Sequence, residues 1–142
     1  MFLLDTNVVS ELRRPGKADP KALAWAQSVP MIQQYVSAIN ILELEQGVLA
    51  RERSDPVQGA ILRTWLDDTV RVQLAGRMVS VDEPVALLCA YLHIPNQKSC
   101  RDALIGACAM VHGMTLVTRN PKDFNQMGDV SGKAIKLLNP WG

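Results

Sequence analysis

The chain has 142 residues, a formal net charge of +1, 48% hydrophobic residues and 20% charged residues. We expect one globular domain, because domains of about 100–150 residues with roughly half apolar residues are the commonest. No apolar run approaches the roughly 20 residues that cross a bilayer, and a charge near zero excludes binding of a polyanion through the overall field alone. The N-terminus lacks a basic region and a cleavage site, so a cytoplasmic protein is expected.

Strand and helix patterns alternate from the start of the chain, which favours an α/β fold with a parallel sheet. The apolar residues 1–4 are expected to form a buried strand, followed by a short helix that ends near residues 14–16. Asp19 and Pro20 fit the N-cap and first position of the next helix.

The middle of the chain continues this alternation. Residues 35–37 are expected to form a second strand, and Asn40 to cap a helix that runs to about Leu49. Residues 55–56, Asp-Pro, are expected to begin another helix, and residues 78–81 to be extended.

The last part of the chain has two further helix starts. One lies at residues 82–84, Asp-Glu-Pro, and Ser99 is expected to cap a helix over residues 100–112 that Gly113 ends. Residues 115–118 and 135–138 are expected to complete the sheet. No linker or repeat divides the chain, so residues 1–142 are expected to form a single domain.

Three cysteines, Cys89, Cys100 and Cys108, are present without a CxxC spacing. An odd number without ligand spacing argues against a disulfide framework or a zinc site. All three are interpreted as small buried apolar residues.

Three isolated acids stand where parallel strands and helix starts are expected to meet. Asp5 directly follows the first strand, Glu43 is expected in the first turn after the second strand, and Asp102 in the first turn of the helix before residues 115–118. Ligands of open α/β sheets bind beyond the carboxyl ends of the strands. Asn120 is expected to follow its strand as Asp5 follows the first one.

Each acid also has a purely structural explanation. Asn40 with Glu43, and Ser99 with Asp102, have the spacing of a capping box, and Asp5 fits an Asx-turn. Three carboxylates in one pocket, however, raise one another's pKa. A divalent cation removes that conflict, and ligands that are all oxygen favour Mg²⁺ or Mn²⁺ over zinc.

Four segments of the chain resemble PIN-domain ribonucleases, specifically the VapC-type toxins of toxin–antitoxin systems. They are LLDTNVVSEL at 3–12, SAINILELEQG at 37–47, RDALIGACA at 101–109 and TLVTRNPKDF at 115–124. The DEPVA run at 82–86 and the closing NPW at 139–141 resemble the plasmid-stability branch of these toxins. The resemblance spans nearly the whole chain and keeps the order of the motifs.

This resemblance implies a PIN-like domain with a central parallel sheet flanked by helices, which cleaves RNA phosphodiester bonds with Mg²⁺ or Mn²⁺. The family's catalytic positions fall on Asp5, Glu43, Asp102 and Asn120, and the first three are its metal ligands. Many members have Asp where this chain has Asn120. Asp123 either replaces that acid, directly or through water, or caps the turn after Pro121.

Further residues are candidates for contact with the substrate: Thr6, Asn7, Arg119 and Asp123. Thr6 and Asn7 either bond a carboxylate or phosphate at the metal site or cap the first helix. Arg119 either contacts phosphate or forms a salt bridge with a neighbouring acid.

The implied partners are an RNA substrate, a neutralising VapB-type antitoxin and a second copy of the chain in a homodimer. DNA is expected to be contacted only through the antitoxin, and no membrane is involved. Two other functions remain: a catalytically weak PIN-like module that binds RNA or protein, and an aspartyl phosphotransferase. The second is disfavoured because Asp5 is not followed by DxT and Lys122 is its only candidate lysine.

Overall fold

Five short parallel strands form the central sheet, in the order β3-β2-β1-β4-β5. The computed structural model describes all residues from 1 to 142. The strands are β1 (Phe2–Leu4), β2 (Gln34–Ser37), β3 (Met78–Val79), β4 (Thr115–Val117) and β5 (Leu137–Leu138). The expected α/β fold with a parallel sheet is confirmed, although β3 and β5 are shorter than the sequence pattern indicates.

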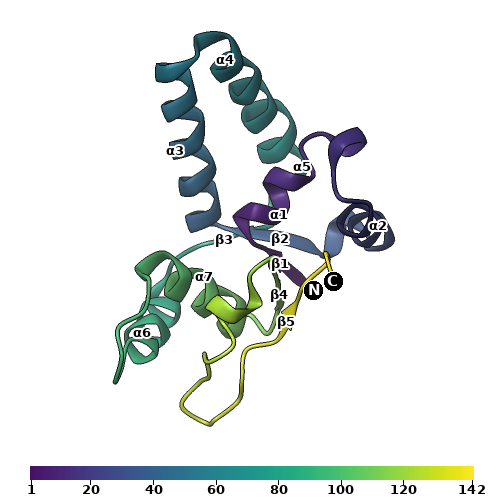
Figure 1. Ribbon diagram of the computed structural model, residues 1–142. Coiled ribbons are helices and arrows are strands. Elements are labelled where there is room, and N and C mark those ends of the chain that lie inside the picture. The colour runs from purple at the N-terminus through teal and green to yellow at the C-terminus, as the bar shows by residue number, and fades with distance from the viewer.

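Helices cover both faces of this sheet (Figure 1). On one face lie α1 (Thr6–Glu11), α3 (Ala38–Ser54), α4 (Pro56–Trp65), a π-helical turn η3 (Leu66–Val70) and α5 (Arg71–Gln73). On the other face lie α6 (Glu83–Leu92) and α7 (Cys100–Val111), and α2 (Pro20–Ser28) lies beside the sheet. Short 3-10 turns are η1 (Pro15–Lys17), η2 (Met31–Gln33) and η4 (Pro121–Asp123).

Two apolar clusters form the core, one on each face of the sheet. Leu3 belongs to the cluster that includes the buried side chains of α6 and α7, whereas Leu4 belongs to the cluster with those of α1 and α3. Successive side chains of a strand point to opposite faces, and both of these leucines are buried. The uninterrupted apolar run of β1 is therefore explained by helices on both faces.

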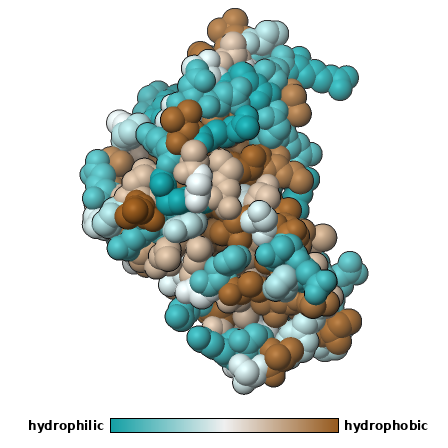
Figure 2. Space-filling model, turned by 180° about the vertical axis from the view of Figure 1, so that it is seen from behind, coloured by the Kyte–Doolittle hydropathy of each residue, from teal (hydrophilic) through white to brown (hydrophobic).

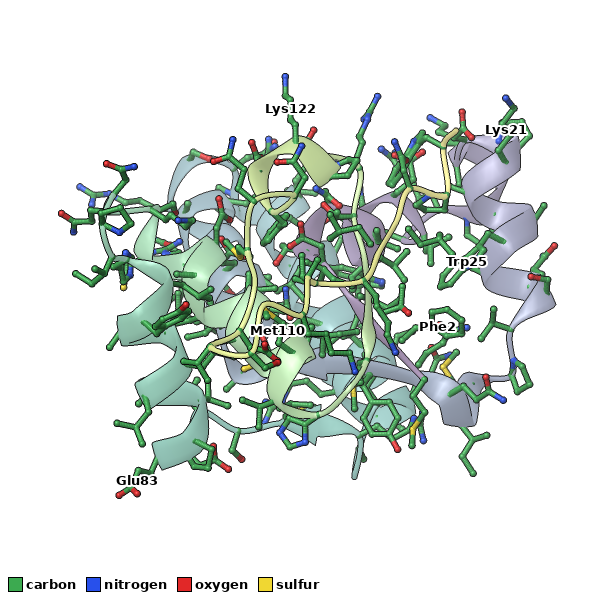
Figure 3. The ribbon with its side chains drawn as sticks, turned by 90° about the horizontal axis from the view of Figure 1, so that it is seen from below. Phe2, Lys21, Trp25, Glu83, Met110 and Lys122 are labelled. Carbon is green, nitrogen blue, oxygen red and sulfur yellow. The ribbon has the colours of Figure 1, made fainter.

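Helix α2 is held beside the sheet by an aromatic contact. The rings of Phe2 in β1 and Trp25 in α2 meet edge to face, with centroids 5.4 Å apart (Figure 3). The helix begins as expected, because Asp19 accepts hydrogen bonds from the backbone N–H groups of Lys21 and Ala22.

The start of α3 differs from the expectation. Ser37, not Asn40, is the N-cap, and Asn40 is the third helical residue, where its side chain bonds back to the backbone of Ser37. Ser and Asn are both favourable N-cap residues. Strand β2 ends at Ser37, and the helix begins directly after it, so Ser37 is the cap. Glu43 therefore lies in the second turn of α3 instead of the first.

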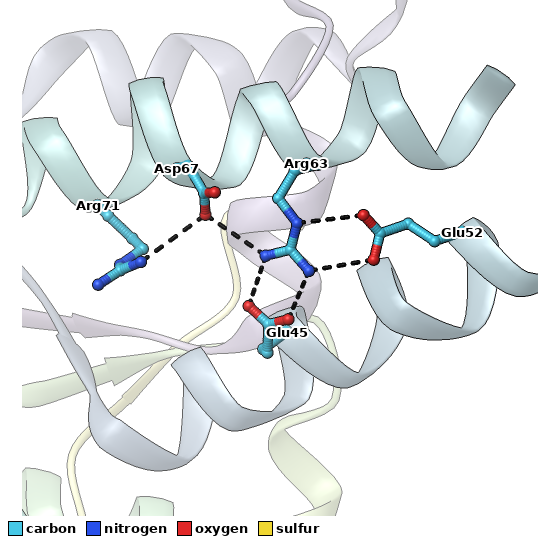
Figure 4. A network of polar contacts seen from close by, with 5 residues as sticks. All are labelled: Glu45, Glu52, Arg63, Asp67 and Arg71. Carbon is cyan, nitrogen blue, oxygen red and sulfur yellow. Dashed lines mark hydrogen bonds and ion pairs between the residues drawn. The ribbon is translucent and has the colours of Figure 1, made fainter. Parts of the chain in front are cut away.

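Helices α3 and α4 form an antiparallel hairpin that extends away from the sheet (Figure 1). Arg63 of α4 donates hydrogen bonds to Glu45 and Glu52 of α3 and to Asp67 in η3, and Asp67 also pairs with Arg71 (Figure 4). Each of the first two carboxylates is bound through both oxygens, a geometry that the planar guanidinium favours. This network links the two helices of the hairpin.

The cysteine prediction is correct for two residues and wrong for one. Cys89 and Cys108 are buried, and burial raises the pKa of the Cys108 thiol to about 11, so that it stays protonated. Cys100 is exposed, because it is the first residue of α7, where the helix leaves the loop.

The surface carries exposed apolar side chains among polar ones, as the rear face shows (Figure 2). Ile32 and Val130 are among the most exposed of them. No helix has the length and apolar character that a membrane span requires.

Candidate active site

Asp5 lies at the carboxyl end of β1 and is only 8% exposed. Its Oδ1 accepts a 2.8 Å hydrogen bond from the backbone N–H of Thr6, which makes Asp5 the N-cap of α1. Its Oδ2 accepts 2.8 Å and 3.4 Å hydrogen bonds from Thr118 Oγ1 and Asn7 Nδ2. Asp5 thus has a local role at the start of α1. That role does not explain the hydrogen bond from the Thr118 hydroxyl, which lies 113 residues further along the chain.

Glu43 reaches the same region from α3. Its Oε1 accepts a 2.7 Å hydrogen bond from Thr6 Oγ1, and its Oε2 lies 3.8 Å from Nη1 of Arg101. The capping-box explanation for Glu43 is wrong, because the capping box at this helix joins Ser37 and Asn40.

Asp102 is half-buried in the first turn of α7, as expected. Ser99 occupies the N-cap position, but its side chain makes no capping hydrogen bond. The capping box proposed for Ser99 and Asp102 is therefore absent, and helix capping does not account for this acid.

The charges of these acids act on one another. The pKa of Asp5 is raised mainly by burial. The hydrogen bonds from Thr118 and Thr6 lower it, and the negative charges of Glu43 and Asp123 raise it further. The pKa of Asp102 is also raised by burial first, and then by the charges of Asp5, Asp123 and Glu43. Asp5, Glu43, Asp102 and Asp123 come from four separate segments, and at one edge of the sheet they lie near enough for their charges to interact.

The four acids have the oxygen donors that a hard cation such as Mg²⁺ prefers, but their side chains are not gathered closely around one point. No three acidic, histidine or cysteine side chains are close enough to form a ready-made metal cluster. The four acids Asp5, Glu43, Asp102 and Asp123 offer only carboxylate oxygens as donors, and Arg101 forms the one ion pair that they make. This excess of negative charge and the oxygen donors fit Mg²⁺ or Mn²⁺, provided that the side chains close in on the ion.

The raised pKa of Asp102 predicts a pH-dependent stability of the metal-free protein. Its pKa in the fold lies above the ordinary 3.8, so the carboxyl group stabilises the fold below that pH and loses this contribution as the pH rises through the raised pKa. In EDTA, Asp102→Asn is expected to melt above the original protein at pH 7, and the gain should vanish below about pH 3.8, where both side chains are neutral.

The control for this prediction is Glu83→Gln, because Glu83 lies in the first turn of α6 as Asp102 lies in the first turn of α7. Both changes remove a favourable interaction with a helix N-terminus. Melting curves between pH 3 and 8 that gave both variants the same pH dependence would contradict the prediction.

Asn120 and Asp123 follow β4 but do not stand where the sequence suggested. Leu4 is in register with Val117, so the residue beside Asp5 is Thr118, and the expectation that Asn120 takes that position is wrong. Asn120 is exposed and occupies the N-cap position of η4, without a side-chain cap bond. Asp123 is not the cap of this turn, and its charge raises the pKa of both Asp5 and Asp102.

The candidate substrate-binding residues have clear partners. Thr6 and Asn7 do not cap α1; their side chains bind the carboxylates of Glu43 and Asp5. Arg119 is exposed, and its guanidinium lies 5.1 Å from the centre of the Trp141 ring. The salt bridge expected as its alternative role is absent, and contact of Arg119 with phosphate stays a prediction.

Sequence reasoning did not identify three residues of the site. Thr118 binds Asp5, Asn40 donates a 3.0 Å hydrogen bond to Thr6 Oγ1, and Arg101 pairs with Glu43. The polar residue at the end of an apolar strand was a usable signal for Thr118. The other two contacts join α3 to α1 and α7 to α3, so no local pattern reveals them.

Comparison with known proteins identifies the family of this chain. Residues 2–130 match the PIN domain family. The chain is 31% identical to Toxin FitB of Neisseria gonorrhoeae over 99% of both chains. It is 54% identical to Ribonuclease VapC14 of Mycobacterium tuberculosis over 69 residues, which are 49% of this chain and 66% of that protein. The crystal structure of FitAcB from Neisseria gonorrhoeae superposes with a TM-score of 0.84, at 31% identity and 99% coverage of each chain.

The matched family region includes all four acids described above, and the full-length relatives share the whole fold. The protein belongs to the PIN-domain family and, within it, to the VapC-type toxins.

Proposed function

We propose that the protein is a metal-dependent endoribonuclease toxin that cleaves RNA phosphodiester bonds in the cytoplasm. The observation that carries the proposal is geometric: Thr6 binds Asp5 through its backbone N–H and Glu43 through its hydroxyl at the carboxyl end of β1. Asp102 and Asp123 lie near enough for their charges to act on Asp5. Like charges that are partly buried are unfavourable without a cation. Relatives named ribonucleases support RNA as the substrate.

Asp5, Glu43 and Asp102 are the residues that would hold Mg²⁺ or Mn²⁺, with Asn120 or Asp123 at the fourth position. Such an ion, when bound, lowers the pKa of a coordinated water and offsets the charge of the phosphate. The hydrogen bonds from Thr118 and the Thr6 backbone hold Asp5 in place. No catalytic histidine is required by this arrangement.

Oε2 of Glu43 is the oxygen that would bind the ion, because its other oxygen accepts the hydrogen bond from Thr6. Arg101, which is 3.8 Å from that free oxygen and half exposed, can turn toward a phosphate of the RNA. Arg119 lies at the rim next to Thr118 and is proposed to contact a neighbouring phosphate. These cations offset the repulsion between the acidic site and a polyanion.

A neutralising antitoxin of the VapB type is the proposed protein partner, and a homodimer the proposed assembly. A cavity of about 390 Å³ between α1 and η3 is lined by apolar residues such as Leu12, Met31 and Trp65, with Arg13 at its side. This cavity suits an apolar side chain of a partner peptide. A structure with the same fold is described as a toxin–antitoxin complex from Klebsiella pneumoniae, and DNA is proposed to be reached only through such a partner.

One observation favours a second candidate, a PIN-like module that binds RNA without efficient cleavage. The fourth family position holds the neutral Asn120, and no ready-made metal cluster is present. Asp123 lies close enough to influence both Asp5 and Asp102, which favours the nuclease.

Removal of metal tests the two candidates. Purified protein is expected to cleave single-stranded and structured RNA with Mg²⁺ or Mn²⁺, and to lose the activity in EDTA until either ion is restored in excess. Denaturing gels give the cleavage rate, and RNA binding is measured in the same buffers. Cleavage that persists in EDTA would contradict metal dependence, whereas RNA binding without cleavage in Mn²⁺ would favour the binding module.

A further inference from the structure

Asn40 is a fully buried polar side chain that helix capping only partly explains. Its Oδ1 accepts hydrogen bonds of 2.8 Å from the backbone N–H of Ser37 and 2.7 Å from the Ser37 hydroxyl. A backbone N–H can only donate, so these bonds identify which end of the amide is the oxygen. The amide nitrogen must therefore point the other way, toward α1.

The direction of the next hydrogen bond follows from this orientation. Asn40 Nδ2 lies 3.0 Å from Thr6 Oγ1, and an amide nitrogen can only donate. The Thr6 hydroxyl accepts that bond, so its single proton is directed to Glu43 Oε1, 2.7 Å away. A hydrogen bond to a carboxylate is among the stronger ones in proteins.

Thr6 thereby joins two of the acids. Its hydroxyl binds Glu43, and its backbone N–H binds Asp5 Oδ1 at 2.8 Å. One oxygen of each acid is held by the same residue, while Glu43 Oε2 is left without a hydrogen bond and faces Arg101 at 3.8 Å.

We propose that Asn40 is a positioning residue, which acts through Thr6 to hold Glu43 in one rotamer beside Asp5. The inference rests on the proposed function, in which these acids bind a divalent ion. A glutamate without this restraint samples several rotamers, and ion binding must then order it. The capping box needs only the oxygen of Asn40, so its bond to Thr6 is the part that serves the site.

The sharpest test is Thr6→Val, which removes the hydroxyl with little change of shape and keeps the backbone bond to Asp5. Mn²⁺ affinity is expected to fall roughly tenfold and kcat roughly 10–100-fold, as when other residues that orient metal ligands are changed, with KM for RNA nearly unchanged. Thr6→Ser, which keeps the hydroxyl, should restore most of both. Mn²⁺ binding is measured by calorimetry and kcat by gel assay.

Asp82→Ala is the control for a general loss of stability. Asp82 caps α6 through the backbone N–H of Val85, so its removal lowers the melting temperature without touching this hydrogen-bond chain. A double-mutant cycle adds Asn40→Ala, which should have no further effect on Mn²⁺ affinity once Thr6 is Val. Additive effects in the cycle would show that Asn40 does not act through Thr6.

The outcomes separate this proposal from the proposed function. Wild-type Mn²⁺ affinity in Thr6→Val, or an equal loss in Asp82→Ala, would overturn the positioning role even if the protein is a nuclease. Mn²⁺ binding that depends on Thr6 in a protein without RNA cleavage would support the positioning role and end the nuclease proposal. A wild-type protein that bound no Mn²⁺ would overturn both.

Discussion

Asp5→Asn is expected to lower kcat/KM for RNA cleavage at least about a hundredfold, because it removes the charge of a proposed metal ligand. The new side chain has nearly the same shape. Its oxygen can still accept the hydrogen bond from the Thr6 backbone, and its amide can lie against Thr118 Oγ1. Asn is also a good N-cap, so α1 should remain folded. The loss should therefore reflect chemistry and not unfolding, and circular dichroism checks this directly.

Asp19→Asn is the matched control. Asp19 caps α2 as Asp5 caps α1, but it lies outside the acidic cluster. Its rate should equal that of the original protein, measured at several Mg²⁺ concentrations with one RNA. An Asp5→Asn variant that cleaves as fast as the control would remove the basis of the nuclease proposal.

Gly59→Ala is expected to destabilise the protein by about 1–3 kcal/mol or more, the usual range for an over-packed contact. A Cβ atom at Gly59 would lie 2.4 Å from the backbone Cα of Glu52 and 2.6 Å from its backbone nitrogen. Backbone atoms cannot turn aside as a flexible side chain does, so α4 must shift away from α3. That shift would also strain the bonds between Arg63 and the two glutamates of α3 (Figure 4).

Gly47→Ala is the matched control in the same hairpin, with the opposite expected sign. Gly47 is exposed inside α3, and a Cβ atom there would meet nothing within 4 Å. Alanine has the higher helix propensity, so this change should add roughly 0.5–1 kcal/mol. Urea unfolding of both variants measures the two effects. Equal effects would mean that the close approach of the helices does not limit stability.

The local pattern of residues was enough to predict the fold class and the starts of several helices. The apolar run of β1, and the Asp-Pro pairs before α2 and α4, depend on backbone preferences that act within a few residues. The position of Asp5 could be predicted in the same way, since a residue that follows a buried strand emerges at the sheet edge. The order of the predicted elements also placed Glu43 and Asp102 near that edge, and the motif resemblance then implied their catalytic and metal-binding roles.

The remaining features depend on which segments pack together. The register between β1 and β4 places Thr118, not Asn120, beside Asp5. Ser37 and Asn40 are both suitable N-caps, and the structure uses Ser37. Helix α3 therefore begins three residues earlier than expected, and Glu43 lies in its second turn.

Side-chain contacts across long stretches of chain are decided in the same way. Arg101 meets Glu43, and Asn40 meets Thr6, only because helices from separate segments converge at one sheet edge. Periodicity and capping patterns describe residues that are neighbours along the chain, so they cannot predict contacts between distant segments. The sequence alone determines which acids are present and which helices and strands carry them. The packing of both helical layers on the sheet determines which side chains bind these acids, because those contacts join distant segments.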